Sequence, residues 1–175
     1  KKENTMATIT FQGKPLNTTG DLPAVGSDAP DFSLVSGQLK DVSLATYKGK
    51  IKVLSIVPSL DTPTCAASTR IFNQKADNLD NTVVLVVSAD LPFAQGRFCE
   101  SEGLKDVLPL STFRSSFAED YGVKIVDTIL AGLLTRAIVV IDAHDKVVYT
   151  ELVAEVADEP NYEEVLVACK DAASN

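Results

Sequence analysis

The sequence has few of the residues that build metal sites and disulfide frameworks. Its 175 residues include one histidine and three cysteines, and no two cysteines have the spacing Cys-x-x-Cys. Three widely separated thiols exclude a disulfide-stapled scaffold and favour a reducing compartment, so we expect a cytoplasmic protein, with the periplasm as the alternative. A zinc site would have to draw on scattered ligands, and we therefore expect no metal and no other cofactor.

Long apolar runs and an excess of basic charge are also missing. No run approaches the ~18 residues of a membrane span, and the N-terminus shows no apolar core followed by a small-residue cleavage site. The sequence has 24 acidic and 16 basic residues, which gives a net charge of -8. Such a chain is repelled by phosphate backbones and anionic membrane surfaces, so we expect neither nucleic acid nor membrane as a partner.

The chain has no Gly-rich linker, internal repeat or low-complexity segment, so the sequence predicts one domain over residues 8–175. Its content of 45% hydrophobic and 23% charged residues is typical of a soluble domain with a real core. Residues 1–7 are interpreted as an N-terminal extension. The five residues before Met6 are either an artificial addition ahead of a natural start or the remainder of a processed leader, and we prefer the addition.

Strands and helices alternate along most of the chain. The sequence predicts an N-terminal hairpin at residues 8–16 and strands at 31–35, 42–44, 51–57, 82–88, 137–142 and 147–153. It predicts helices at residues 63–79, 92–102, 115–121 and 161–172. This order indicates an α/β fold with a mixed sheet flanked by helices, and a thioredoxin-like arrangement fits it.

Cys65 lies where a buried strand passes into a helix, in the segment Pro58-Ser59-Leu60-Asp61-Thr62-Pro63-Thr64-Cys65. With Thr62 as the N-cap and Pro63 at the first helical position, the thiol falls at the third position of the helix. Free backbone N–H groups and the helix dipole favour its ionised form there by ~0.3–1 kcal/mol, and at most ~2 kcal/mol. A buried structural cysteine is the alternative, which a proline-capped junction disfavours.

A reactive thiolate at this position also needs a cation. Lowering the pKa of a thiol from ~8.5 to ~6 takes ~3.4 kcal/mol, which exceeds the contribution of the helix dipole. A guanidinium within ~4 Å can supply the remainder. The first candidate is Arg136, at the start of a predicted strand, for which a surface ion pair is the alternative role. The second is Arg70, on the same helix as Cys65.

Five sequence blocks share one resemblance. They are Pro58-x-x-x-Thr62-x-x-Cys65, Asp61-Thr62-x-x-Cys65-Ala66-Ala67-Ser68, Ser88-Ala89-Asp90-Leu91-Pro92-Phe93-Ala94-Gln95, Arg97-Phe98-Cys99 and Leu110-Ser111-Thr112-Phe113-Arg114. These blocks resemble the bacterial thiol peroxidases, a subfamily of atypical two-cysteine peroxiredoxins with a thioredoxin-like fold. The resemblance runs from about Thr8 to Lys170, nearly the whole chain.

The resemblance implies a thiol peroxidase that reduces hydrogen peroxide and organic hydroperoxides to water or alcohols. Cys65 would be the peroxidatic cysteine, and Pro58 would shield its thiolate from solvent. Thr62 and Arg136 would hold the peroxide in line. Cys99 would be the resolving cysteine, which closes an intramolecular disulfide with Cys65 that thioredoxin then reduces. A homodimer is implied as well.

Cys169 and His144 are interpreted as outside the reaction. Tyr162, Val165, Leu166 and Cys169 are spaced i, i+3, i+4 and i+7, which predicts one apolar helix face with the thiol in the core. His144 lies in the predicted hairpin turn at residues 143–146, where we expect an exposed side chain. That position disfavours a Cys-His hydrolase.

Two other classes of protein stay open. A thioredoxin-like disulfide oxidoreductase would share the fold, but Ala66, Ala67 and Ser68 follow Cys65 where such a protein normally has Cys-x-x-Cys. A non-catalytic binding or chaperone-like module would need only the fold and an apolar surface, for which the loop at residues 129–134 is a candidate.

Four leucines flank the candidate residues in sequence and predict an apolar entrance to the site. They are Leu60, Leu130, Leu133 and Leu134. Such an entrance favours organic hydroperoxides over hydrogen peroxide, whereas packing in the core or in a dimer is the alternative role of these leucines.

Overall fold

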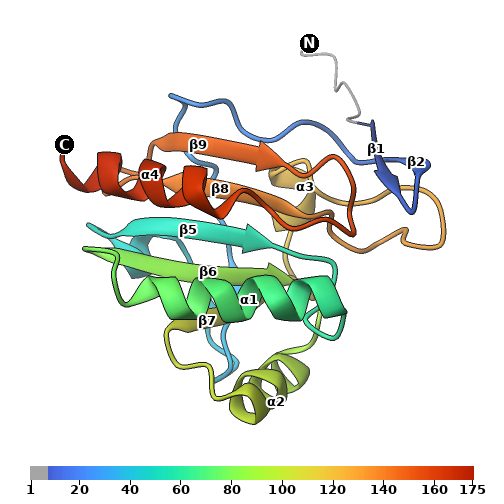
Figure 1. Ribbon diagram of the computed structural model, residues 1–175, viewed down its shortest axis with the longest axis horizontal. Helices are drawn as coiled ribbons and strands as arrows, with labels where there is room; N and C mark the ends of the chain where they lie inside the picture. The colour runs from blue at the N-terminus through green and yellow to red at the C-terminus, as the bar shows by residue number, and fades with distance from the viewer. Residues whose placement is uncertain (1–7) are drawn as a thin grey trace.

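Runs of valine, isoleucine and leucine form the centre of a seven-stranded sheet (Figure 1). They are the strands β5 (Ile51–Ile56), β6 (Thr82–Ser88) and β8 (Ala137–Ile141), which are buried over most of their length because helices or loops cover both faces. The computed structural model describes residues 8–175, so the predicted extension at residues 1–7 lies outside the described residues.

The sheet is mixed, as the sequence predicts, with the strand order β4-β3-β7-β6-β5-β8-β9. The outer strands are β3 (Leu34–Val35), β4 (Asp41–Val42), β7 (Val107–Ser111) and β9 (Val147–Leu152). The strands β5, β6 and β7 are parallel to one another. Antiparallel pairing joins β8 to β5, β9 to β8, and β3 to both β4 and β7.

The pairing of β5 with β8 decides which loops meet at one edge of the sheet. Ile56 at the end of β5 lies opposite Ala137 at the start of β8. The residues just after β5 and β6 and just before β8 therefore gather at one edge, which is on the right in Figure 1. Cys65, Asp90 and Arg136 belong to these three segments.

Two helices, α1 (Pro63–Ala76) and α4 (Tyr162–Ala173), cover the face of the sheet that is in front in Figure 1. Phe72 and Val165 of these helices pack on the sheet residues Val53, Val84 and Ile138. The opposite face carries α3 (Phe117–Asp120), and the 3-10 helix η1 (Leu44–Tyr47) precedes β5. The sheet is therefore covered by an apolar layer on each face.

The helix α2 (Pro92–Glu102) lies beside β7 at the lower end of the view in Figure 1. It ends at Gly103, as predicted, because the left-handed conformation at φ 66° is one that glycine adopts without a steric penalty. Only Pro92 and Gln95 of this helix are buried. It is therefore less firmly anchored than α1, which buries five side chains.

The predicted N-terminal hairpin is present as β1 (Thr8–Phe11) and β2 (Lys14–Asn17). Its two turn residues, Gln12 and Gly13, both have positive φ, at 51° and 76°, which is the conformation of a tight two-residue turn. The Gly13 amide donates to Glu155 Oε1 over 2.9 Å and so fixes the turn to the C-terminal part of the chain.

The sequence pattern does not predict one strand, β7. Pro109 lies at its centre and lacks the N–H group that a sheet ladder uses. The structure accommodates Pro109 since β3 reaches β7 at a single position, Val35 opposite Ser111, so the strand is nearly an edge at Pro109. Smaller differences are that the strands near residues 31–44 are shorter than predicted and that α1 ends at Ala76 rather than at residue 79.

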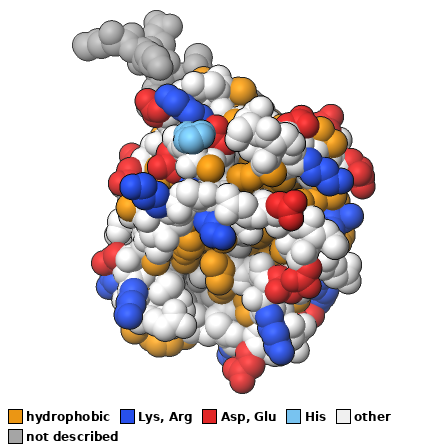
Figure 2. All heavy atoms as spheres, turned by 90° about the vertical axis from the view of Figure 1, so that its left-hand side faces the viewer, with side chains coloured by type: hydrophobic (Ala, Val, Ile, Leu, Met, Phe, Trp, Pro, Cys, Tyr) orange, Lys and Arg blue, Asp and Glu red, His pale blue; other side chains and the backbone are white. Residues whose placement is uncertain are grey.

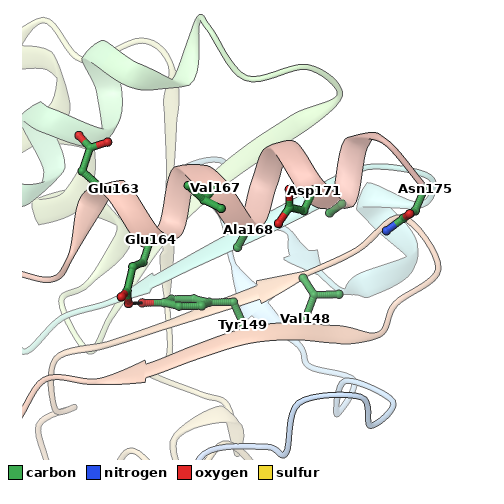
Figure 3. A pocket seen from close by; sticks show the side chains of 9 residues that line it. Val148, Tyr149, Glu163, Glu164, Val167, Ala168, Asp171 and Asn175 are labelled. Carbon is green, nitrogen blue, oxygen red and sulfur yellow. Dashed lines mark hydrogen bonds between the residues drawn. The ribbon is translucent and has the colours of Figure 1, made fainter.

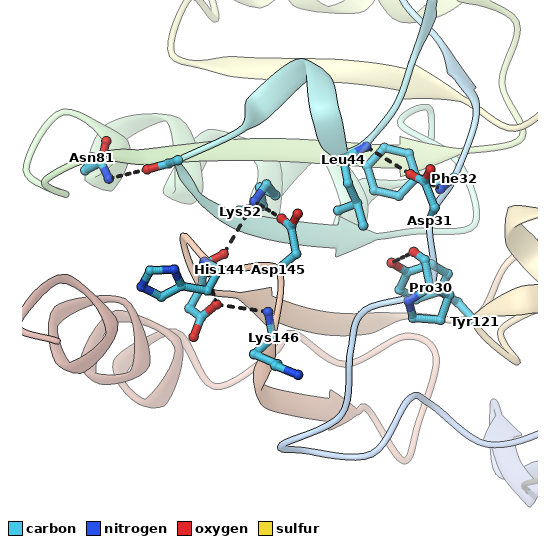
Figure 4. A network of polar contacts seen from close by, with 12 residues as sticks. Pro30, Asp31, Phe32, Leu44, Lys52, Asn81, Tyr121, His144, Asp145 and Lys146 are labelled. Atoms are coloured by element: carbon cyan, nitrogen blue, oxygen red, sulfur yellow. Dashed lines mark hydrogen bonds and ion pairs between the residues drawn. The ribbon is translucent and has the colours of Figure 1, made fainter.

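A buried lysine lies at the opposite end of the sheet (Figure 4). Lys52 of β5 has no exposed side-chain surface, and its Nζ donates to Asp145 Oδ1 over 2.6 Å and to the Asp142 carbonyl over 3.4 Å. Asp142 Oδ1 accepts hydrogen bonds from the backbone N–H groups of His144 and Lys146. His144 is exposed on this turn, as predicted.

Charged side chains of both signs are interspersed on that end of the molecule, without a large field of positive charge (Figure 2). Within residues 8–175, no helix is both long enough and apolar enough to cross a membrane.

Candidate active site

Cys65 occupies the third position of α1, after Thr62 at the N-cap and Pro63 at the first position, as the sequence predicts. Its side chain is fully buried. Its Sγ accepts a hydrogen bond from Arg136 Nη2 over 3.0 Å. A guanidinium can only donate, so the sulfur is the acceptor in this contact.

Arg136 is itself buried, with 2% of its surface exposed, so the alternative of a surface ion pair is wrong. Its Nε donates to the Val156 carbonyl over 2.9 Å, which fixes the guanidinium plane. Its Nη1 is buried without a hydrogen-bond partner among residues 8–175. A buried donor left unpaired costs about 1–3 kcal/mol or more, so this atom marks a place for an oxygen of a ligand beside Cys65.

The second candidate cation, Arg70, does not contact Cys65. It forms a paired hydrogen bond with Glu102, with its Nε 2.7 Å from Oε2 and its Nη2 2.9 Å from Oε1, and nearly half of its side chain is exposed. Arg70 lies five residues after Cys65 on α1, and this spacing places the two side chains on different faces of the helix.

Thr62 does not cap α1 with its side chain. Its hydroxyl instead donates to the Ser59 carbonyl over 3.0 Å. The hydroxyl hydrogen is therefore committed, and the Thr62 oxygen is left to act only as an acceptor toward a ligand. This arrangement fits an oxygen that receives the O–H group of a hydroperoxide.

A pocket of about 290 Å³ opens beside these residues. Thr62, Arg136 and Pro58 form its wall together with three apolar side chains, Phe11, Leu130 and Leu133. Pro58 is a buried residue of that wall.

The expected apolar entrance is therefore present in part. Leu130 and Leu133 line the pocket, whereas the predictions for Leu60 and Leu134 are wrong, because those side chains are 2% and 1% exposed and belong to the core. Ile129 in the same loop is 91% exposed. The exposed apolar surface at residues 129–134 therefore includes Ile129 but not Leu134.

Cys99 lies half-buried on α2, and burial raises the pKa of its thiol. The three cysteines are all free. The neighbouring Phe98 packs against the apolar cluster that contains Cys65, so α1 and α2 border the same part of the core. The resolving role of Cys99 stays a prediction.

Cys169 belongs to the core of α4, as predicted, where it packs in one cluster with Val165. Burial raises the pKa of its thiol to about 11. Ser68 holds the position of the second cysteine in a Cys-x-x-Cys motif, and its hydroxyl donates to the Cys65 carbonyl over 3.1 Å. These positions offer no second thiol for disulfide exchange at α1.

The sequence analysis missed Asp90, which the structure places beside the loop before α1. Its Oδ1 accepts from Ser59 Oγ over 2.7 Å, and its Oδ2 accepts from the Leu60 N–H and from Ser88 Oγ, each over 2.8 Å. The signal that was available is an acidic residue two positions after a buried parallel strand, since such residues gather at the carboxyl edge of a sheet.

A larger groove, of about 440 Å³, lies between α4 and β9 (Figure 3). It is lined by Val148, Val167 and Ala168 together with carboxylates, and Tyr149 donates to Glu164 across it over 3.2 Å. It contains no cysteine and no cation, so the chemistry at Cys65 does not extend to it. Among residues 8–175 there is also no group of three side chains placed to hold a metal ion.

The chain is similar to known proteins over nearly its whole length. The Redoxin family profile matches residues 24–166, a range that includes all the candidate residues. The thiol peroxidase of Mycobacterium tuberculosis is 56% identical over 163 residues, which cover 93% of this chain and 98% of that protein. A solved peroxiredoxin-like protein from Aquifex aeolicus has a TM-score of 0.90 at 41% identity, covering 95% of this chain and 98% of that one. A thiol peroxidase from Chromobacterium violaceum has a TM-score of 0.88 at 26% identity, covering 95% and 97%.

Proposed function

The chain belongs to the Redoxin family, with thiol peroxidases as relatives over nearly its full length, and from this premise we propose that it reduces hydroperoxides with the Cys65 thiolate as nucleophile. The observation that carries the choice of Cys65 is the 3.0 Å hydrogen bond from Arg136 Nη2 to its Sγ. No other cysteine among residues 8–175 has a cation within hydrogen-bond distance.

In the first step the Cys65 thiolate attacks the terminal oxygen of a hydroperoxide R–O–O–H. The S–O bond forms as the O–O bond breaks, so the sulfur is oxidised by two electrons to a sulfenic acid and the alkoxide RO⁻ leaves. The alkoxide takes a proton from solvent and departs as an alcohol, or as water when R is hydrogen.

The neighbouring side chains fit this step. The unpaired Arg136 Nη1 donates toward the oxygen on which negative charge develops, where a fixed donor lowers the barrier most. The Thr62 oxygen accepts the O–H of the hydroperoxide and turns its terminal oxygen toward Sγ. Pro58, in the pocket wall, keeps bulk water from the thiolate.

In the second step the Cys99 sulfur, as thiolate, attacks the Cys65 sulfenic acid. An S–S bond forms, the S–O bond breaks, and hydroxide leaves and is protonated to water. We propose thioredoxin as the dithiol that reduces this disulfide and is itself oxidised to a disulfide. We further propose a cytoplasmic homodimer, whose contact the 91%-exposed Ile129 favours because an apolar side chain gains by burial.

Mass spectrometry after one equivalent of hydroperoxide tests the two-cysteine scheme. The wild-type chain should lose two hydrogens and yield a linked pair of peptides that contain Cys65 and Cys99. Cys99→Ser should instead gain one oxygen on Cys65, and Cys169→Ser should behave as the wild type. A disulfide that includes Cys169, or no peroxide consumption with dithiothreitol present, would contradict the proposal.

The partners are tested separately. Turnover with thioredoxin, thioredoxin reductase and NADPH should exceed turnover with glutathione, and sedimentation should give twice the chain mass. The same turnover rate with both reductants would contradict thioredoxin as the partner. A sedimentation mass equal to one chain would contradict the dimer.

A further inference from the structure

The Asp90 carboxylate is the centre of a polar cluster that joins the loop before α1 to the start of α2. On one side it accepts from Ser59 Oγ and the Leu60 N–H. On the other it accepts from Ser88 Oγ, which in turn accepts from Gln95 Nε2 of α2 over 3.0 Å. Gln95 is buried and also donates to the Leu110 carbonyl of β7 over 2.9 Å, so the cluster is anchored to the sheet.

Ser59 transmits this anchoring to Thr62. Its hydroxyl donates to Asp90, while its carbonyl accepts from both the N–H of Thr62, over 3.3 Å, and the Thr62 hydroxyl, over 3.0 Å. The Ser59 hydroxyl also accepts from the Asp61 N–H over 3.1 Å. The orientation of the Ser59 peptide, and with it the direction of the Thr62 oxygen, therefore depends on the Asp90 carboxylate.

We propose that Asp90 is a positioning residue for the reduction of hydroperoxide: through Ser59 it holds the Thr62 oxygen in the orientation that receives the substrate. The inference rests on the proposed function. Asp90 does not line the pocket, and the hydrogen bond between Arg136 and Cys65 uses no atom of the cluster. Loss of the carboxylate therefore affects the orientation of the substrate and leaves the nucleophile intact.

Asp90→Asn is the test variant, because asparagine has the same shape but its amide nitrogen cannot accept a hydrogen bond. Two second-order rate constants are measured on the reduced full-length chain at pH 7: reduction of cumene hydroperoxide, and alkylation of Cys65 by iodoacetamide followed by mass spectrometry. The hydroperoxide rate should fall on the order of 10–100-fold, the effect of misplacing a reacting group by a fraction of an ångström to one ångström. The alkylation rate should stay within about twofold, since the thiolate and its guanidinium are unchanged.

Asp106→Asn is the matched control. Asp106 is an exposed acidic residue next to the start of β7, and its substitution makes the same change in charge. Both rate constants should stay at the wild-type value in this variant. Equal losses in Asp90→Asn and Asp106→Asn would assign the effect to charge and overturn the inference.

Ser59→Ala removes the serine hydroxyl that donates to Asp90 and provides a second, milder variant. It should lower the hydroperoxide rate in the same selective way. The double variant should be no slower than the slower single variant, because two residues that act through one another are not additive. Multiplied losses in the double variant would overturn the inference, as would an Asp90→Asn variant with an unchanged hydroperoxide rate or with both rates lowered equally. A wild-type chain that reduces no hydroperoxide would instead overturn the proposed function itself.

Discussion

Arg136 Nη2 lies 3.0 Å from Cys65 Sγ, although 71 residues separate the two in the sequence. The antiparallel register that pairs Ile56 with Ala137 produces this contact, because it brings the residue before β8 to the edge at which β5 leads into α1. The buried guanidinium is held by the Val156 carbonyl as well, so its position does not depend on the thiol alone.

Arg136→Lys should lower the rate constant for hydroperoxide reduction by about 10²–10³-fold, the effect of losing one fixed donor to a developing negative charge. Lysine keeps the charge but cannot bond Val156, Cys65 and a substrate oxygen from one rigid plane. Stopped-flow measurement with the reduced enzyme checks this, and Arg70→Lys is the control because Arg70 pairs with Glu102 on the surface and not with Cys65. Similar losses in the two variants would contradict the role of Arg136.

Cumene hydroperoxide should react faster than hydrogen peroxide, because Phe11, Leu130 and Leu133 give the pocket an apolar wall. Leu133→Ala should lower the rate with cumene hydroperoxide by about tenfold and leave hydrogen peroxide within about twofold, as expected from the loss of apolar contact with one substrate only. Leu108→Ala is the matched control, since Leu108 is exposed on β7 and lies outside this pocket. Equal rate constants for the two peroxides in the wild type would remove the basis of this prediction.

Oxidation should increase amide hydrogen exchange at residues 62–70 and 97–103 while residues 83–87 stay protected. A disulfide needs Cα atoms within roughly 7 Å, and Cys65 and Cys99 lie in helical segments after different strands. Closing a loop of about 35 residues offsets local melting by roughly 3.8 kcal/mol in the chain-entropy model, enough for a helical turn or two. We expect the larger increase in α2, which buries only Pro92 and Gln95.

Hydrogen exchange with mass spectrometry on the reduced and the oxidised chain measures this difference. Cys99→Ser exposed to the same peroxide is the control, because it forms the sulfenic acid without the disulfide. Unchanged exchange in both helices, together with a confirmed disulfide between Cys65 and Cys99, would show that no local opening accompanies the reaction.

The free energy of unfolding should fall between about pH 9 and pH 11 through Cys169. Burial raises the pKa of this thiol from 9.0 to about 11, so the unfolded chain loses its proton first as the pH rises and is stabilised relative to the folded chain. The loss from this group is about 2–3 kcal/mol at the upper end of the range. This pH-dependent loss should be absent from Cys169→Ala. The packing that the substitution itself removes lowers the free energy of unfolding by the same amount at every pH.

Urea unfolding of both chains at pH 8, 9, 10 and 11 in reducing buffer measures this difference. Subtracting the two curves cancels contributions from tyrosines and from Cys99, which both chains share. A difference between wild type and Cys169→Ala that does not shrink as the pH rises would contradict the assignment.

Local patterns were enough to predict most of the elements and the placement of Cys65. Pro63 after Thr62 marks the start of α1, and this alone puts Cys65 at the third helical position. Gly103 marks the end of α2 in the same way. The sequence pattern did not predict β7, because Pro109 interrupts it. The strands that pair with β7, which are β3 and β6, become its neighbours only in the folded sheet.

The sequence by itself determined the fold class, the position of Cys65 at the start of a helix and the two candidate cations, Arg136 and Arg70. Only the tertiary structure decided that Arg136 and not Arg70 meets the thiol, that Leu130 and Leu133 but not Leu60 and Leu134 line the pocket, and that Asp90 supports Ser59. The physical reason is range: capping, turns and periodicity act over a few residues, whereas a hydrogen bond across 71 residues exists only once the strand order and register have set which loops share an edge.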